Sequence, residues 1–452
     1  MNWRSFLWPT LKPTPSRAGL HHFRIDLPDR QSRIHLRIEP DGSGLMLVDA
    51  TVAVRLNQTA MEIARAILEG RSLEETRRTL RGKFRKVSAE QVAADYEKIR
   101  QVLYPEGPVE DVCPWLRLAS REDEPFSIKV SAPYRADLAL TYRCQNDCPH
   151  CYVERERNMP SLSTPEWKRV LSKLWDVGIP HICFTGGEAT LYEELEELIE
   201  TAEDLGQITG LLTNGRRLSE RAYARGLVGA GLDHVQVTIE SHIEDVHNRM
   251  VGAQGFGETL AGLKNMIAED VYTVTNTTLT RLNVPGIEAT VEFLHGLGVK
   301  AFACNSLIIS GGAKESEDGL TIEELAALLP LVSAKARALG MRFIWYTPTP
   351  YCRLNPAELG LGFKRCTAAE YNICIEPGGD VLPCQSCYRV AGNILTDDWK
   401  HIWEGEVFRE IRERLSVPDE CRSCPDFSVC GSACPLSREH DMVLCTDRVS
   451  EG

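Results

Sequence analysis

The stretch Leu138-Ala-Leu-Thr-Tyr-Arg-Cys144-Gln-Asn-Asp-Cys148-Pro-His-Cys151 decides the fold of this chain. Its apolar first half predicts a strand, and three cysteines spaced C-x3-C-x2-C follow on one tight loop. Three thiolates are one ligand short of closing a four-iron cluster, so one iron keeps open positions for a small molecule. Zinc is the alternative. It takes a fourth ligand, and His150 lies inside the Cys148–Cys151 step, where it is poorly placed to be one.

This loop, His150 included, resembles that of the radical SAM superfamily. The resemblance implies that Cys144, Cys148 and Cys151 hold a catalytic [4Fe–4S] cluster, whose remaining iron binds the amino and carboxylate groups of S-adenosylmethionine. It also implies reductive cleavage of the sulfonium to a 5′-deoxyadenosyl radical, which abstracts a hydrogen atom from substrate. An electron donor such as flavodoxin or ferredoxin is then expected as a partner.

Length and composition set the class of protein. A chain of 452 residues with 43% apolar and 25% charged residues suggests several globular domains. No apolar run approaches the ~20 residues of a membrane span, and the first residues lack a signal peptide, so we expect a cytoplasmic protein. Sixteen cysteines in that compartment argue for metal binding. The net charge of −13 argues against wholesale nucleic-acid binding, although it leaves room for local patches.

Strand and helix patterns alternate through a central region, residues 136–345. Strands are expected at 138–142, 182–185, 208–213, 234–239, 274–279 and 301–307, and helices at 164–176, 195–205, 219–230, 257–269 and 287–297. This alternation predicts a parallel sheet covered by helices, in an α/β fold. The six units match the partial (β/α)6 barrel of the radical SAM family. Active sites in such sheets lie at the carboxyl ends of the strands.

Motifs follow the ends of the predicted strands, as an active site there requires. The second strand ends in Gly186-Gly187-Glu188, which matches the family motif that contacts the methionyl amino group. Thr213 and Asn214 end the third strand and are expected beside the cofactor. Thr238 and Glu240 end the fourth, a conservative departure from the Ser-x-Asp that relatives usually show. The resemblance makes them candidates for contacts to the ribose. Arg249 is a candidate for the methionyl carboxylate, or else a surface arginine.

The first 110 residues predict a small domain of strands followed by three helices. Residues 34–48 predict a hairpin, and the boxes Ser72-x-x-Glu75 and Ser88-x-x-Gln91 start two of the helices. This order, with Val54-Arg-Leu-Asn-Gln-Thr-Ala-x-x-Ile63, resembles the winged-helix-like peptide-recognition element of ribosomal-peptide modifying enzymes. The resemblance implies that a leader peptide adds to the sheet edge as a strand. A proline-rich linker is expected at 111–135.

Ten cysteines crowd into the last region, residues 346–452. The pattern Cys366-x12-Gly379-x4-Cys384, followed by C-x2-C-x5-C-x3-C from Cys421, closely resembles the SPASM extension, a cysteine-rich iron–sulfur domain. The resemblance implies two auxiliary [4Fe–4S] clusters, so three clusters in all. Cys366, Cys384 and Cys434 would share the first, and Cys421, Cys424, Cys430 and Cys445 the second.

The fourth ligand of the first auxiliary cluster is open. We take Cys352; Cys374, Cys387 or an iron left free for substrate are the alternatives. Four-cysteine spacing alone would also suit one or two structural zinc ions.

Together these features predict a peptide maturase that binds a ribosomal precursor peptide through its leader and crosslinks it oxidatively. One alternative is oxidation of a protein residue, a tetrapyrrole or another small molecule, with the first domain only structural. An alternative of another class is an iron–sulfur regulator that reads DNA through the basic residues around 77–86.

Overall fold

The computed structural model describes residues 18–27, 31–49, 52–84, 88–104, 126 and 130–438. The chain forms two compact units, Met1–Glu124 and Pro125–Gly452. Among the described residues, no helix combines the length and the apolar character that crossing a membrane requires. The predicted Cys445 lies outside the described residues, as does most of the predicted linker.

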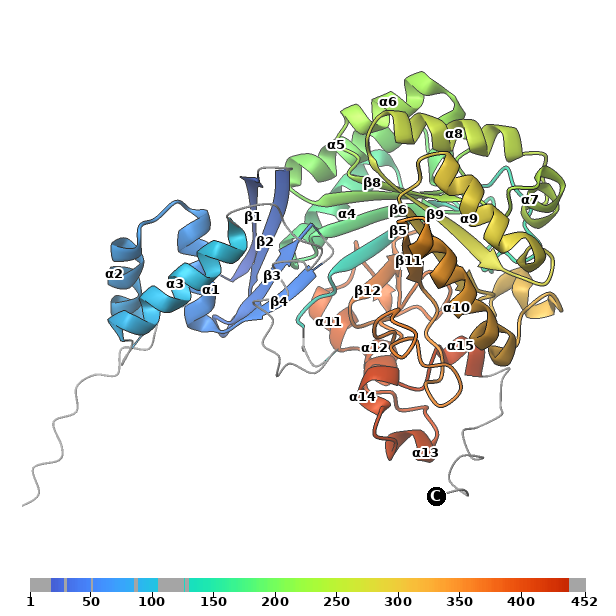
Figure 1. Ribbon diagram of the computed structural model, residues 1–452. Helices are drawn as coiled ribbons and strands as arrows, with labels where there is room; N and C mark the ends of the chain where they lie inside the picture. Colours follow the sequence, from blue (N-terminus) through green and yellow to red (C-terminus); the bar gives the residue numbers. More distant parts are fainter. Residues whose placement is uncertain are drawn as a thin grey trace, which may run out of the picture. The chain divides into compact units, whose positions relative to one another are not determined.

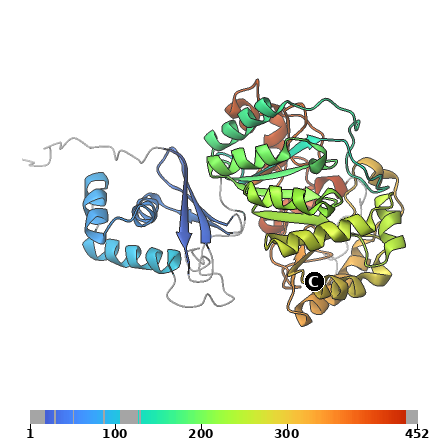
Figure 2. The same cartoon turned by 90° about the horizontal axis from the view of Figure 1, so that it is seen from above.

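The first unit is an antiparallel sheet followed by three helices. The strands are β1 (Gly19–Asp26), β2 (Gln31–Ile38), β3 (Gly44–Val48) and β4 (Val52–Leu56), in the order β1-β2-β3-β4. The helices are α1 (Gln58–Leu68), α2 (Leu73–Lys83) and α3 (Ala89–Leu103), on one side of the sheet (Figures 1 and 2). Ser72 and Glu75 form the predicted capping box. The predicted hairpin is present, with β1 and β4 as additional strands.

The second unit is built on one long sheet that begins as a parallel barrel. Its parallel strands are β5 (Arg135–Thr141), β6 (His181–Gly186), β7 (Ile208–Thr213), β8 (His234–Thr238), β9 (Tyr272–Leu279), β10 (Ala301–Ser306) and β11 (Arg342–Trp345). Spatial neighbours from β5 to β11 are also neighbours in the sequence. The six predicted strands are present, and β11 is a seventh that the prediction lacks.

Helices cover the outer face of these strands (Figure 1). They are α4 (Thr164–Asp176), α5 (Leu195–Leu205), α6 (Arg221–Gly229), α7 (Glu244–Val251), α8 (Phe256–Ala268), α9 (Ile287–Gly296) and α10 (Ile322–Ala338). Strand residues such as Ile182, Phe184 and Leu211 are fully buried in the core under the helices. Because side chains alternate along a strand, the odd-numbered residues of β6 face the barrel interior.

The cysteine-rich region continues the same sheet. Strand β12 (Asn372–Ile375) pairs in parallel with β5, and β13 (Asp380–Leu382) and β14 (Gly392–Asn393) follow antiparallel. The predicted turn at 377–380 joins β12 to β13. Short helices complete the region: α11 (Trp399–Glu404), α12 (Glu406–Arg412), α13 (Asp419–Arg422), α14 (Phe427–Cys430) and α15 (Pro435–Arg438). Cys374, on β12, and Cys384, two residues after β13, are therefore anchored on the sheet that carries the 144–151 loop.

Candidate active site

The loop of residues 144–151, named here the cysteine loop, follows the carboxyl end of β5. Its three thiols are close to one another: burial raises the pKa of Cys148, and the neighbouring Cys151 and Cys144 add to the effect. Burial also raises the pKa of Cys144 and of Cys151. The amide of Asn146 donates to Sγ of Cys144 over 3.4 Å. Three half-buried thiols with a donor aimed at sulfur fit a metal cluster, whose positive charge replaces the thiol protons.

The turn after β6 lies directly against the strand that leads into the cysteine loop. A Cβ on Gly186 would stand 2.1 Å from the carbonyl oxygen of Thr141, and one on Gly187 would stand 2.4 Å from that of Tyr142. Gly187 N–H donates to the Thr141 carbonyl over 2.8 Å. The two glycines therefore allow close approach to the β5 backbone, which is a reason for them that the motif alone does not reveal.

Glu188 joins the ends of β6 and β7 from a buried position, with 1% of its surface exposed. Its Oε1 accepts hydrogen bonds from the hydroxyls of Thr190 and Thr213, each over 2.7 Å. Its Oε2 accepts from the backbone N–H of Asn214 over 2.7 Å. Burial raises the pKa of this carboxyl, against the effect of these hydrogen bonds. An oxygen with one partner keeps a second acceptor direction, so Oε2 can take another donor.

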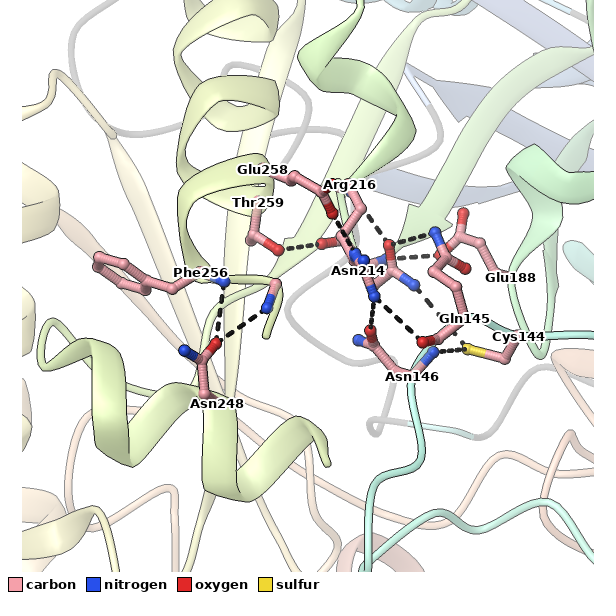
Figure 3. A network of polar contacts seen from close by, with 12 residues as sticks. Cys144, Gln145, Asn146, Glu188, Asn214, Arg216, Asn248, Phe256, Glu258 and Thr259 are labelled. Atoms are coloured by element: carbon pink, nitrogen blue, oxygen red, sulfur yellow. Dashed lines mark hydrogen bonds and ion pairs between the residues drawn. The ribbon is translucent and has the colours of Figure 1, made fainter. Parts of the chain in front are cut away.

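Asn214 and Arg216 connect the end of β7 to the cysteine loop (Figure 3). The Asn214 side-chain amide points at Sγ of Cys144 over 3.9 Å. Arg216 donates to Oδ1 of Asn146 over 2.9 Å and to the Gln145 carbonyl over 3.1 Å, and it is paired with Glu258 of α8. The sequence prediction missed Arg216 because no motif marks an arginine that reaches across to another strand end.

Glu240, after β8, meets the cysteine loop from the other side. It is 1% exposed, and its Oε2 accepts from the Thr278 amide over 2.8 Å. Nε2 of His150 lies 3.3 Å from its Oε1. His150 thus contacts Glu240, a partner that the sequence prediction did not give it when it weighed His150 as a zinc ligand and as a match to the family's loop. The expected ribose contact of Glu240 stays a prediction.

Two other predicted residues, Thr238 and Arg249, lie at the end of β8 and in α7. Thr238 is half-buried and pairs in register with Asn276 of β9. Arg249 is exposed in the last turn of α7. The segment after it holds the cysteine loop, because Asp147 N–H donates to the Val251 carbonyl over 2.9 Å.

One set of thiols gathers around Cys384. Burial raises the pKa of Cys384, and Cys366, Cys387 and Cys434 are the thiols that add to the shift. The backbones of Cys384 and Cys387 form an isolated antiparallel β-bridge, and Cys387 N–H donates to the Cys384 carbonyl over 3.2 Å. Cys374 is buried on β12. Four thiols around one point are the number that a closed cluster needs.

The remaining described cysteines of this region occupy short helical turns. Cys424 N–H donates to the Cys421 carbonyl over 3.2 Å, and Cys430 is buried at the end of α14. The amide of Tyr351 donates to Sγ of Cys430 over 3.4 Å, so Cys352 follows a residue that contacts this second set.

This arrangement is that of a radical SAM domain followed by an auxiliary-cluster domain, and comparison with known families agrees. Residues 138–294 match the model of the radical SAM superfamily, and residues 366–425 match SPASM, an iron–sulfur cluster-binding domain. The chain therefore contains a radical SAM domain and a SPASM domain. These domains imply [4Fe–4S] clusters and S-adenosylmethionine as cofactors, and the grouped thiols fit them.

Particular relatives and solved structures are similar to most of the chain. The chain is 28% identical over 317 residues to the PqqA peptide cyclase of Rhizobium meliloti (strain 1021), and the alignment covers 67% of this chain and 83% of that protein. A second PqqA peptide cyclase, from Bradyrhizobium diazoefficiens, is 28% identical over 353 residues, covering 71% and 91%.

The fold is similar to that of Streptococcus suis SuiB bound to its precursor peptide SuiA, with a TM-score of 0.70, 15% identity and 90% and 95% of the two chains covered. SuiB bound to S-adenosylmethionine gives a TM-score of 0.66 at 16% identity, with 90% and 96% covered.

Proposed function

We propose that this chain is a radical SAM oxidoreductase that crosslinks a ribosomally made precursor peptide. The observation that carries the proposal is the cysteine loop at the carboxyl end of a parallel sheet, joined through Asn214 to the buried carboxylate of Glu188. Relatives named PqqA peptide cyclase support a peptide as the substrate. In this proposal, residues 1–110 recognise the peptide, 111–135 are a linker, 136–345 are the catalytic barrel and 346–452 hold the auxiliary clusters.

Cys144, Cys148 and Cys151 hold the catalytic cluster in this proposal. When cluster and cofactor are bound, they supply a 5′-deoxyadenosyl radical. Glu188 offers Oε2 to the methionyl amino group, since that oxygen has an acceptor direction left. Gly186, Gly187 and Thr213 set the position of Glu188, and Asn214 and Arg216 hold the loop. Ribose contacts by Thr238 and Glu240, and a carboxylate contact by Arg249, belong to the same proposal.

Cys387 is the fourth ligand that we propose for the first auxiliary cluster, with Cys366, Cys384 and Cys434. Its place beside Cys384 supports it over Cys352, because Cys352 follows Tyr351, whose N–H is hydrogen-bonded to Sγ of Cys430. Cys421, Cys424, Cys430 and Cys445 are proposed for the second cluster.

These clusters give the reaction its electron balance. The peptide gives one hydrogen atom to the radical and then loses one proton and one electron. A bound auxiliary cluster would provide the acceptor for that electron, and a donor such as flavodoxin or ferredoxin would provide the electron for cofactor cleavage.

The first unit suits an extended peptide rather than DNA. Its four-stranded sheet has β1 and β4 as edge strands, to which a leader could add. Two basic side chains of α2 are paired with acids: Arg77 with Glu74, and Lys83 with Glu62 over 2.8 Å. Charges neutralised in this way contribute little to binding phosphates.

Thiolate ligation of iron needs reducing conditions, so we place the protein in the cytoplasm.

The test is to incubate the anaerobically reconstituted enzyme with reductant, S-adenosylmethionine and a short peptide encoded beside it, and to record the intact mass of the peptide. Loss of two hydrogens, absent with the Cys148→Ala variant, is expected. Fragment spectra then locate the new bond. An unchanged mass, with no deuterium uptake from heavy water although the cofactor is cleaved, would contradict this peptide as substrate. A chain lacking residues 1–110 should still cleave the cofactor but leave the full-length peptide unmodified.

A further inference from the structure

Two histidines and a cysteine meet inside the barrel, at the end opposite the cysteine loop. His181 is the first residue of β6, Cys183 lies two residues further, and His234 is the first residue of β8. Cys183 pairs in register with Gly210 of β7, and Gly210 pairs with His234. Cys183, Gly210 and His234 therefore lie in one row across the three strands. The ligating atoms of His181, Cys183 and His234 all lie within 4.8 Å of one another.

Gly210 is required by this cluster. A Cβ at that position would stand 2.2 Å from Cε1 and 2.4 Å from Nε2 of His234, and 2.7 Å from Sγ of Cys183. Glycine inside a strand weakens it and often marks a place where another group approaches closely. Here the missing side chain lets the thiol of β6 and the imidazole of β8 reach each other over β7.

The donor atoms are those that zinc prefers. Nε2 of His181 lies 2.8 Å from Nε2 of His234, and Cys183 is fully buried beside them. Burial lowers the pKa of His234 to about 4, so its ring is neutral near pH 7 and can bind a metal. Burial raises the pKa of the Cys183 thiol to about 12, an effect that the nearby Arg135 guanidinium opposes. Mixed imidazole and thiolate sets suit zinc, whereas oxygen ligands suit magnesium or calcium.

We propose that His181, Cys183 and His234 bind a zinc ion, with water as its fourth ligand, at a site separate from the iron–sulfur clusters. Binding releases the Cys183 proton and replaces the hydrogen bond between the two imidazoles. Ligand atoms of a tetrahedral site lie roughly 3.3 to 3.6 Å apart, so the rings must separate by about half an ångström. Asp137 balances Arg135 through an ion pair of 2.6 Å, which leaves the neighbourhood near neutral. Zinc would join β6 to β8 and stabilise the barrel.

The test is zinc analysis of the full-length, anaerobically reconstituted protein, combined with X-ray absorption at the zinc edge. We expect about one zinc per chain, with a ligand shell of nitrogen and a single sulfur. A sulfur-only shell would show zinc held by the cluster cysteines instead and would overturn the proposal, as would absence of zinc. The shell is measured on the unmodified chain, so the result does not depend on any variant folding.

Variants then assign the residues. Cys183→Ser and His234→Asn should each lose the zinc, and adding zinc should raise the melting temperature of the zinc-depleted wild type but not of these variants. Cys304→Ser is the matched control, because Cys304 is equally buried in β10 but belongs to the core under the helices. Zinc retained in Cys183→Ser, or lost equally in Cys304→Ser, would mean that the trio is only a hydrogen-bonded cluster of buried side chains.

Discussion

Glu188→Gln should separate catalysis from stability. Glutamine keeps one oxygen for the Thr190 and Thr213 hydroxyls but places an NH2 group where Oε2 accepts from the Asn214 amide over 2.7 Å. Two donors then face each other in a buried site. Loss of a hydrogen bond to a charged group costs about 2 to 3 kcal/mol. If this free energy is added to the activation barrier, because Asn214 and the cofactor are less well positioned, turnover drops roughly 30- to 160-fold.

The stability of the fold should change much less. Burial raises the pKa of Glu188, so the wild-type carboxylate is disfavoured near neutral pH by a burial cost that a neutral amide avoids. A carboxyl with a raised pKa stabilises the folded state below its unfolded pKa and loses that contribution as pH rises through the folded value. At pH 7 the substitution therefore removes a hydrogen bond and a desolvation penalty together, and the two effects offset each other.

The assay is formation of 5′-deoxyadenosine under dithionite, with iron content and melting temperature measured on the same samples. Glu258→Gln is the matched control, because Glu258 is 52% exposed and its pairing with Arg216 is of the kind that contributes about 1 kcal/mol or less. A wild-type rate and KM in Glu188→Gln would refute the reasoning. Equal loss in Glu258→Gln would show that the effect comes from general disturbance of the loop.

Three further outcomes are expected. Gly187→Ala places Cβ 2.4 Å from a backbone oxygen and should destabilise by about 1 to 3 kcal/mol. Gly257→Ala meets no atom of the described residues within 4 Å and should be neutral or better; equal melting temperatures would contradict this. Cys387→Ser should lower the iron bound per chain and alter the auxiliary-cluster signal in electron paramagnetic resonance, while Cys374→Ser leaves both unchanged; the reverse pattern would assign Cys374 instead. Burial lowers the pKa of His247, so stability is present above the unfolded pKa of 6.5 and is lost as pH falls. The free energy of unfolding should therefore fall between pH 7.5 and 5.5, and a His247→Gln variant with an undiminished loss would exclude this histidine.

The parallel barrel and the position of its site could be predicted because they depend on local patterns. Helix α4 carries a Ser163 capping box, and its predicted range equals the observed one. The Gly-Gly-Glu and Thr-Asn motifs follow apolar runs, and parallel strands place such segments at one edge of a sheet. Strand β1 was missed because His21 and His22 interrupt its apolar alternation.

Contacts between distant strand ends could not be predicted in the same way. Arg216 reaches Asn146 across 70 positions of sequence, and nothing near either residue encodes that distance. His181 and His234 meet only because β7 lies between their strands with glycine at the crossing position. The apolar run around Cys183 favours a core position for this residue; it is fully buried, but it faces the barrel interior with two imidazoles rather than the helices.

The position of the cysteine loop follows from contacts with three strand ends. The turn after β6 bonds to the strand before the loop, Asn214 and Arg216 after β7 bond to the loop itself, and Glu240 after β8 meets His150. A loop fixed from three sides cannot shift toward one without losing contacts to another. The three thiols are therefore held near one another by the protein itself, and the cluster has less ordering entropy to offset when it binds.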